Sequence, residues 1–392
     1  MTGGPGGPPQ PRAHLSPPDP GAPLFPGGVV IVGTGLIGAS VGLALRGRGI
    51  GVWLSDRDPR TAELAASLGA GDPLSQDTPP TGGPADLAVL AVPPDAVATV
   101  LAAAQKTGLA TCYTDVASVK ASPLAAAREL GCDLAGYVPG HPLAGRERSG
   151  PAAARADLFL GRPWALCPVP ENTTAAVDRV TRLVTACGAK PVTAGADEHD
   201  HWVALVSHAP HLVASAMAAR LAGAPDGALT LVGQGLRDVT RIAAGDTGLW
   251  SQILTANAAG VAEVVAAVAG DLRRAAAALA GGDTTGLAAL LDAGQDGVAR
   301  IPGKHAGPAT RYATVQVVIP DQPGELARLF QACGEAGVNI EDIRIEHSPG
   351  LPAGVAELAV KPDAAEPLAT ALAARGWPAY VQPDGGQAVA TG

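Results

Sequence analysis

Three patterns of hydrophobic and polar positions follow one another along the chain. Between residues 28 and 195, short β-branched runs alternate with segments of helical spacing, from Val29–Val32 and Asp86–Val92 to Trp164–Cys167 and Lys190–Thr193. Strands that alternate with helices predict a doubly wound parallel sheet, with ligands at the carboxyl ends of the strands. We therefore expect residues 28–195 to form an α/β domain of Rossmann type that includes all of these strands.

The pattern changes at residue 196. Prolines become rare, strand signals stop, and apolar stretches predict helices to about residue 300, at Leu205–Leu221, Asp226–Ala243, Leu249–Ala269 and Leu272–Leu279. Helices this apolar on several faces must be buried on more than one side. Packing on the first domain uses one face and a second subunit would use another. We therefore expect residues 196–300 to be an all-helical domain that forms a homodimer.

The third pattern follows a predicted linker at 301–311. A strand at Tyr312–Ile319, a helix to about Ala336, strands from Gly337 to Ile345 and at Val355–Lys361, a helix and a last strand at Ala379–Val381 give the order βαββαβ. This is the ferredoxin-like arrangement. Residues 312–382 are expected to form this domain, and residues 383–392 a tail.

Composition and charge narrow the class of protein. The chain has 392 residues, a net charge of -9 and no basic block, which argues against nucleic acid or an anionic membrane as the main partner. Its five cysteines are scattered without a Cys-x-x-Cys pair, which favours a reducing, cytoplasmic location. Residues 1–27 are rich in Pro and Gly and read as a disordered tail rather than a signal peptide. The uncharged run Val29–Leu45 has the length of a membrane span, but its glycine spacing explains it better.

A glycine-rich turn after the first strand carries the most specific chemical signal. The stretch Gly33-Thr34-Gly35-Leu36-Ile37-Gly38 has the pattern G-x-G-x-x-G between a strand and a helix. Gly33 permits a tight turn, Gly35 lets a pyrophosphate approach the backbone, and Gly38 lets the helix pack closely on the strand. Leu36 and Ile37 open the helix, where free N–H groups favour anions.

The second strand supplies the other half of this signal. It ends at Asp56, 18 residues after Gly38, a position that suits a carboxylate holding the ribose hydroxyls of NAD. Val92 ends a buried strand and is expected at the same edge of the sheet. We expect an NAD site that includes Asp56 and Val92. Arg57, beside Asp56, could instead receive the 2′-phosphate of NADP.

Two loops at strand ends hold the candidate catalytic residues. His141, between Gly140 and Pro142, could accept a proton from a hydroxyl as a hydride leaves the same carbon. Ser118 lies in the stretch Thr114–Lys120 and could donate a hydrogen bond to the reacting oxygen, or could cap the next helix.

The helical domain holds further polar clusters. The run Glu198–His201 has the residue types of a metal site, but hydride transfer to NAD needs no metal and such a run often only caps a helix, so we expect no metal. Arg241 either pairs with Asp238 or holds an anionic substrate, since its planar fork suits a carboxylate.

Five motifs occur in order, namely Gly33–Ser40, Asp115-x-x-Ser118-x-Lys120, Gly140–Gly145, Ser207-His208-x-Pro210-His211 and Arg237–Ala243. Over about residues 28–300 the chain resembles the prephenate/arogenate dehydrogenase family of tyrosine biosynthesis. Residues 312–382, with Asp-x-Pro-Gly-x-Leu and Gly-Val-Asn-Ile, resemble the ACT domain that some members carry.

The resemblance implies NAD-dependent oxidative decarboxylation of prephenate to 4-hydroxyphenylpyruvate. It implies that His141 hydrogen-bonds the ring hydroxyl and assists its deprotonation, and that Ser118 orients both groups. The substrate contacts that it implies are Arg241 for a carboxylate, His211 for the side chain, Glu147 at the gate of the site, and Ser207. It also implies tyrosine as an effector of the ACT domain, near the turn Asp321–Gly324 and Val338–Asn339.

Three alternatives remain. Arogenate dehydrogenase shares the scaffold and differs only in a substrate amino group. Homoserine and phosphoglycerate dehydrogenases also combine such domains with ACT modules, but the helical middle and the Gly-His-Pro loop argue against both. A non-catalytic amino-acid sensor is a different class, and the joint presence of His141, Ser118 and Arg241 argues against it.

Overall fold

The computed structural model describes residues 24–74, 83–145, 149–301, 312–347 and 352–382. The chain divides into two compact units, one ending at Ala266 and the other beginning at Ala267. The nucleotide-binding fold and the first part of the helical region belong to the first unit.

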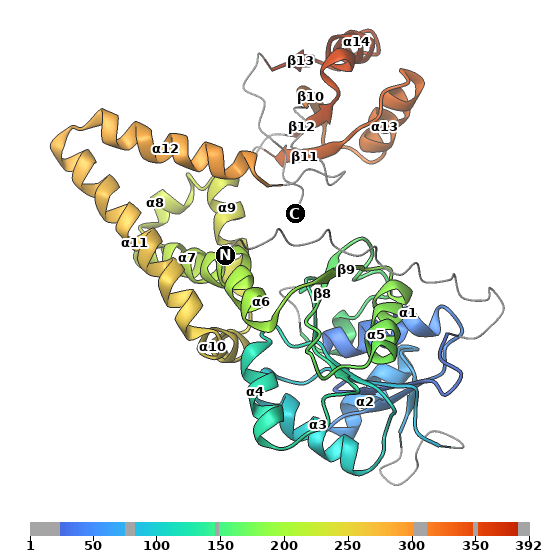
Figure 1. Cartoon of the computed structure of the whole chain (residues 1–392). Coiled ribbons are helices and arrows are strands. Elements are labelled where there is room, and N and C mark those ends of the chain that lie inside the picture. Colours follow the sequence, from blue (N-terminus) through green and yellow to red (C-terminus); the bar gives the residue numbers. More distant parts are fainter. Residues whose placement is uncertain (1–23, 75–82, 146–148, 302–311, 348–351, 383–392) are drawn as a thin grey trace, which may run out of the picture. The chain divides into compact units, whose positions relative to one another are not determined.

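The first unit is built on a six-stranded parallel sheet (Figure 1). Its strands are β1 (Val29–Val32), β2 (Val52–Ser55), β3 (Asp72–Pro73), β4 (Leu87–Leu90), β5 (Tyr113–Asp115) and β6 (Tyr137–Val138). They lie in the order β3-β2-β1-β4-β5-β6, which is the order of the Rossmann fold. The α/β class expected from the sequence is confirmed.

Helices cover both faces of this sheet because its strands alternate apolar side chains between the two faces. Val29 and Ile31 pack against α1 (Leu36–Arg46), α2 (Pro59–Ser67) and α5 (Thr174–Ala186). Val30 faces the other side, toward α3 (Val97–Lys106) and α4 (Ala121–Glu129). Short 3₁₀ turns at Pro94–Ala96 and Pro151–Ala153 complete this part of the chain.

A separate three-stranded sheet corrects one expectation. It contains β7 (Gly140–Pro142), β8 (Pro163–Leu166) and β9 (Lys190–Thr193), with β7 antiparallel to β8 and β8 parallel to β9. The last two strands were expected in the parallel sheet, but that sheet ends at β6. Pro139, which follows β6, has no N–H to donate to a ladder, and the chain there passes into the second sheet.

The predicted N-terminal tail is also shorter than expected. Phe25 is buried in the core of the nucleotide-binding fold, and the Gly27 N–H donates to the Asp86 carboxylate at 2.6 Å. Residues 1–23 lie outside the described part of the chain. The uncharged run from Val29 to Leu45 is a strand followed by a helix, as its glycine spacing predicted.

The breaks in the helical region differ from those predicted: one lies at Asn257 inside the predicted helix Leu249–Ala269, whereas a single helix runs through the predicted gap at residues 270–271. The elements of this region are α6 (Ala196–Val203), a π-helical turn (Ala204–His208), α7 (Ala209–Ala219), a 3₁₀ turn (Arg220–Gly223), α8 (Asp226–Leu229), α9 (Gln234–Thr240), a 3₁₀ turn (Arg241–Ala244), α10 (Thr247–Ala256), α11 (Ala258–Gly281) and α12 (Thr284–Ala299). Asn257 separates α10 from α11, which diverge by 97°. The segment Ala196–Gly223 is long and apolar enough to cross a membrane, but core helices of soluble proteins also meet this criterion.

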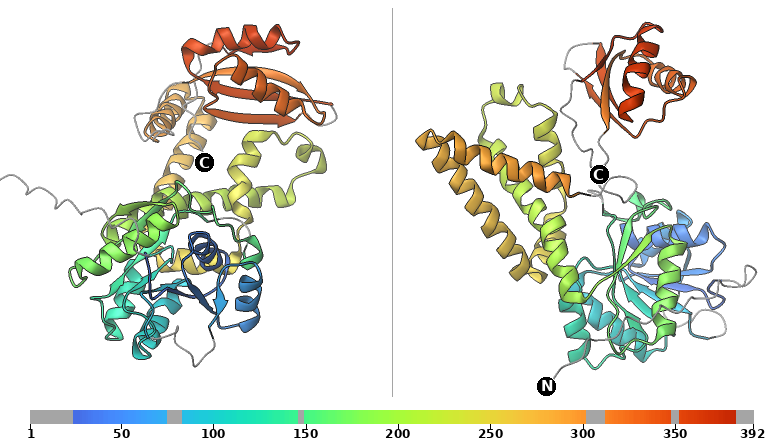
Figure 2. Two further views of the ribbon diagram at one scale, coloured as in Figure 1. Left: turned by 90° about the vertical axis from the view of Figure 1, so that its right-hand side faces the viewer. Right: turned by 45° about the horizontal axis from the view of Figure 1, so that its top comes forward.

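The C-terminal domain has the predicted order βαββαβ and lies in the second unit (Figure 2). Its elements are β10 (Ala313–Pro320), α13 (Glu325–Glu335), β11 (Asp342–His347), β12 (Ala353–Val360), α14 (Pro362–Ala373) and β13 (Ala379–Val381). The strands form an antiparallel sheet in the order β11-β12-β10-β13, and both helices pack on its apolar face. The second strand begins at Asp342 rather than at Gly337, whose φ of +69° ends the preceding helix in a left-handed turn.

Candidate active site

The glycine turn has the backbone shape that its pattern predicts. Gly33 has a φ of +94°, and a Cβ there would lie 2.2 Å from the Ala91 carbonyl oxygen. A Cβ on Gly38 would lie 2.0 Å from the Gly33 oxygen, so α1 packs directly on the turn. A Cβ on Gly35 would meet no atom within 4 Å. The turn is therefore closed on the protein side and open at Gly35, where a pyrophosphate would approach.

The neighbouring groups fit a dinucleotide. Gly35 begins α1 without a side-chain cap, so the N–H groups at Leu36 and Ile37 remain available to an anion. Asp56, just after β2, accepts the Thr34 N–H at 2.6 Å and the Thr34 hydroxyl at 2.9 Å. Val92 lies against Gly33, with its Cγ1 3.2 Å from a Cβ at that glycine. The free N–H groups fit the pyrophosphate of NAD, Asp56 fits the adenosine ribose, and Val92 fits an apolar wall of the site.

His141 is fixed from behind by a buried ion pair. Lys120 is fully buried, forms an ion pair with Asp115, and donates to the Gly140 carbonyl at 2.6 Å. The Tyr137 hydroxyl donates to the other Asp115 oxygen at 2.7 Å. Lys120 therefore holds the backbone of β7 immediately before His141, a role that the sequence did not reveal.

His141 continues into a chain of hydrogen bonds that ends at a carboxylate. Its Nδ1 lies 2.9 Å from His199 Nε2, and His199 Nδ1 lies 2.8 Å from Asp200 Oδ1. The Asp200 carboxylate already accepts two backbone N–H groups, so His199 Nδ1 must carry a proton and donate. Where His199 carries only this proton, its Nε2 accepts and His141 donates from Nδ1. The lone pair of His141 Nε2 is left for another donor.

Asp200 also joins the helical region to the nucleotide-binding fold. Its Oδ1 accepts the Lys120 N–H at 2.8 Å and its Oδ2 accepts the Ala121 N–H at 2.9 Å, at the start of α4. Asp200 therefore caps α4, and the alternative in which Ser118 caps this helix is wrong. Ser118 lies half-buried in the loop between β5 and α4.

Burial keeps His141 neutral. It lowers the pKa of His141 well below 6.5, and the nearby His199, Lys120 and His208 lower it further. A neutral imidazole with a free lone pair is the form that a general base requires.

A second pair of histidines lies at the end of the π-helical turn and in the first turn of α7. The His208 Nδ1 lies 3.2 Å from the Asn257 amide nitrogen, and the π-helical turn that ends at His208 also contains the half-buried Ser207. His211 stacks on Trp250 with ring centroids 3.5 Å apart. Its Nδ1 is buried and has no hydrogen-bond partner within the described chain. Such an atom is poised for a ligand.

The structure separates the remaining candidates. Arg241 begins the 3₁₀ turn that packs on α7, the helix that carries His211, and its side chain is exposed in the single chain. Glu147 lies outside the described residues. In the run expected to be a cap or a metal site, Glu198 accepts the Gly195 N–H at 3.3 Å and His201 is exposed. The cap interpretation is therefore right for Glu198.

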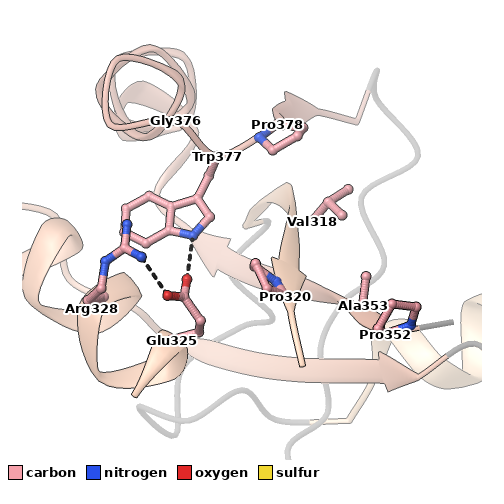
Figure 3. A pocket seen from close by; sticks show the side chains of 9 residues that line it. All are labelled: Val318, Pro320, Glu325, Arg328, Pro352, Ala353, Gly376, Trp377 and Pro378. Atoms are coloured by element: carbon pink, nitrogen blue, oxygen red, sulfur yellow. Dashed lines mark hydrogen bonds and ion pairs between the residues drawn. The ribbon is translucent and has the colours of Figure 1, made fainter. Parts of the chain in front are cut away.

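The C-terminal domain has a cavity of about 300 Å³ at one end of its sheet (Figure 3). Arg328 lies over the Trp377 ring, 4.7 Å from its centroid, and pairs with Glu325. Glu325 also accepts the Trp377 indole N–H at 3.4 Å. Pro320 and Glu325, which line the cavity, flank the turn 321–324 directly.

An open glycine turn on a six-stranded parallel sheet, together with a buried histidine that can act as a base, indicates the class of dinucleotide-dependent dehydrogenases. Comparison with known proteins identifies the family within this class. Residues 41–193 match the family model described as prephenate dehydrogenase, nucleotide-binding domain, residues 195–293 match its dimerization domain, and residues 313–374 match the ACT domain. The chain belongs to the prephenate dehydrogenase family, and it is an NAD-dependent oxidoreductase.

Individual relatives agree with this assignment. A probable prephenate dehydrogenase of Streptomyces niveus, NovF, is 42% identical over 89% of this chain and 98% of its own length. A cyclohexadienyl dehydrogenase of Zymomonas mobilis is 33% identical over 59% of this chain and 80% of its own. The crystal structure of Synechocystis arogenate dehydrogenase superposes with a TM-score of 0.57 at 27% identity, over 69% of this chain and 98% of that one.

Proposed function

We propose that the chain oxidises and decarboxylates prephenate to 4-hydroxyphenylpyruvate, with His141 as the base. The observation that carries this proposal is the hydrogen-bond chain from Asp200 through His199 to His141, which leaves one lone pair on a buried, neutral imidazole. A base that contacts the hydroxyl of the carbon losing hydride is what this reaction requires.

In the proposed reaction His141 Nε2 accepts a hydrogen bond from the ring hydroxyl. It takes the hydroxyl proton as the carbon that bears this hydroxyl loses hydride and is oxidised. Bound NAD would supply the hydride acceptor. The bond to the ring carboxylate breaks, carbon dioxide leaves, and its electron pair completes the aromatic ring. The product is a phenol, so the proton returns to the same oxygen and the histidine is regenerated.

His199 and Asp200 support this base from behind. While His141 holds the proton it is cationic, and the Asp200 carboxylate stabilises that charge through His199. The same contacts fix the ring orientation of His141, so it does not have to reorganise during the step. Ser118, in the loop that Asp200 ties to α4, would hydrogen-bond the same substrate oxygen.

The other substrate contacts remain proposals of the same kind. Arg241 would hold a carboxylate through its planar fork, and His211 would use its unpaired Nδ1 for the substrate side chain. Ser207 would line the site, and Glu147 would gate it. The arogenate dehydrogenase among the solved relatives supports arogenate as the second candidate substrate.

A homodimer is the assembly that best accounts for the exposed apolar side chains of the helical region. Leu231 is 84% exposed in the single chain, and Leu272, Leu279 and Leu291 are each at least 60% exposed. A second copy would cover such surface. We further propose a cytoplasmic location, because all five cysteines are free.

We also propose that tyrosine regulates the enzyme through the ACT domain, near the turn 321–324. The cavity beside this turn combines an apolar wall with Glu325 and Arg328, which could meet the ammonium and carboxylate of an amino acid. In steady-state assays, tyrosine should change the rate of the wild type, and Glu325→Gln should weaken the response. The exposed Glu366, on the other helix, gives the control Glu366→Gln. A wild type that ignores every aromatic amino acid would exclude this role.

The primary test is an absorbance assay for NADH with the full-length chain, NAD and either prephenate or arogenate. Turnover of prephenate with a kcat/KM well above that for arogenate is expected. Turnover of arogenate alone would reassign the substrate, and turnover of neither would favour the non-catalytic sensor.

A further inference from the structure

Asn257 occupies the break between α10 and α11 and faces the active site. It is 9% exposed, and its Nδ2 lies 2.7 Å from the Asp200 carbonyl oxygen. A carbonyl oxygen can only accept, so the amide nitrogen, and not the amide oxygen, must be the atom that faces it. This contact fixes the orientation of the amide.

The fixed amide determines the state of a neighbouring histidine. The same Nδ2 lies 3.2 Å from His208 Nδ1 and has a second N–H to donate there. His208 Nδ1 must therefore present a lone pair, and the neutral ring carries its proton on Nε2. A further proton could enter His208 only at Nδ1, where the Asn257 N–H already points. The amide cannot turn its oxygen toward the ring without losing Asp200.

Charged groups around His208 act in both directions. Burial lowers its pKa to about 4, and His199 and His211 lower it too, whereas Asp200 raises it. His208 is in turn one of the groups that lower the pKa of His141. A positive charge on His208 would therefore make His141 a weaker base.

We propose that Asn257 is a positioning residue for the reaction, which holds His208 in its neutral Nε2–H form and keeps the backbone of Asp200 in place. The consequence for the base rests on the proposed function, whereas the state of His208 does not. Asn257 thus links the break between α10 and α11 to the proton-accepting end of the site.

The state of His208 can be measured on the wild-type protein. In ¹⁵N-histidine NMR, with the His208 signals identified by their loss in His208→Gln, Nδ1 should show the shift of an unprotonated nitrogen at pH 6 and above. A protonated Nδ1 on His208 would overturn the proposal. This result does not depend on turnover of prephenate, so it separates failure of this proposal from failure of the proposed function.

The effect on the reaction is tested with Asn257→Ala. Loss of the amide donor should raise the pKa of His208, so that the cationic His208, which weakens His141 as a base, forms at higher pH. The acid limb of the kcat/KM profile should therefore move upward by about one pH unit, which is a tenfold loss of kcat/KM at a given pH on that limb. Above pH 8, kcat/KM of Asn257→Ala should be only a fewfold below that of the wild type. In the His208→Gln background, Asn257→Ala should no longer move the limb. An unchanged limb in the single variant, or an equal shift in both backgrounds, would contradict the proposal. If Asn257→Ala does not fold, the NMR measurement still decides.

Discussion

The replacement Asp200→Asn tests the hydrogen-bond chain behind His141 directly. The carboxylate accepts three donors, namely the Lys120 N–H, the Ala121 N–H and His199 Nδ1. The asparagine amide has the same shape but accepts only through its oxygen. Its NH2 group must therefore face at least one of the N–H groups that the carboxylate accepted. The two possible orientations of the amide have different consequences.

In the first orientation the amide nitrogen faces Ala121 and the hydrogen-bond chain keeps its direction. The negative charge is lost, and a charge-assisted hydrogen bond becomes a neutral one, a difference of about 1–2 kcal/mol. That would lower kcat by about fivefold to thirtyfold if it acts fully in the transition state.

In the second orientation the amide nitrogen faces Lys120 and His199. His199 Nδ1 must then accept, its Nε2 carries the proton, and His141 must accept through Nδ1. His141 Nε2 would hold a hydrogen and could not accept the substrate hydroxyl. The fall in kcat should then approach the loss of a general base, about 10²–10⁴-fold.

We therefore expect Asp200→Asn to lower kcat by at least about fivefold and to leave the affinity for NAD unchanged. Stopped-flow or steady-state NADH absorbance gives kcat, and fluorescence titration gives the NAD affinity. Asp197→Asn is the matched control, because Asp197 lies exposed on the same helix. A kcat within twofold of wild type for Asp200→Asn, in a folded protein, would refute the role of this carboxylate.

Four further predictions follow from the site. His141→Asn should lower kcat by about 10²–10⁴-fold with NAD affinity unchanged, and a variant above half of wild-type kcat would remove His141 from the mechanism. NAD should be preferred to NADP in kcat/KM, because the Asp56 carboxylate would repel the 2′-phosphate, and parity would overturn that assignment. Arg241→Ala should raise KM for prephenate by about tenfold or more, since each charged hydrogen bond contributes about 1.5–3 kcal/mol, and lysine should restore only part; an unchanged KM would mean that another group holds the carboxylate. The free energy of unfolding should fall as pH drops from about 6.5 to about 4, by up to about 3 kcal/mol from His208, because the unfolded chain binds the proton at higher pH than the folded one. Urea titration should show a weaker pH dependence in His208→Gln, and an equal dependence would argue against a buried neutral His208.

The nucleotide-binding fold could be predicted because its determinants are local. The residues from Val29 to Gly38 carry their own backbone requirements, and the structure meets them with a φ of +94° at Gly33 and close packing at Gly38. The strands after Val138 were placed in the wrong sheet because strand patterns specify extended backbone but not its partner. Phe25 was assigned to the tail because Pro and Gly dominate its neighbourhood, although its side chain packs in the core and the next residues are held by the Gly27–Asp86 hydrogen bond.

The hydrogen-bond chain could not be predicted because its members come together only on folding. His141 and His199 are 58 residues apart, one in the α/β region and the other in the helical region. The run Glu198–His201 was noticed, but its chemistry depends on which side chains point inward. The helix turns His199 and Asp200 into the protein and leaves Glu198 and His201 outside. Lys120 was noticed as part of a motif, but its buried role was not predicted because a lysine is rarely fully buried.

The π-helical turn at Ala204–His208 gives the long helix segment a fixed phase. A turn of this kind is one residue wider than an α-helical turn, and each α-helical residue advances the side-chain direction by about 100°. The extra residue therefore sets the direction in which His208, at the end of the turn, and His211, after it, point relative to His199. Removal of one residue between Ala204 and His208 would restore a regular helix and rotate His208 and His211 away from His199. The length of this turn thus sets the register between His199 on one side and His208 and His211 on the other.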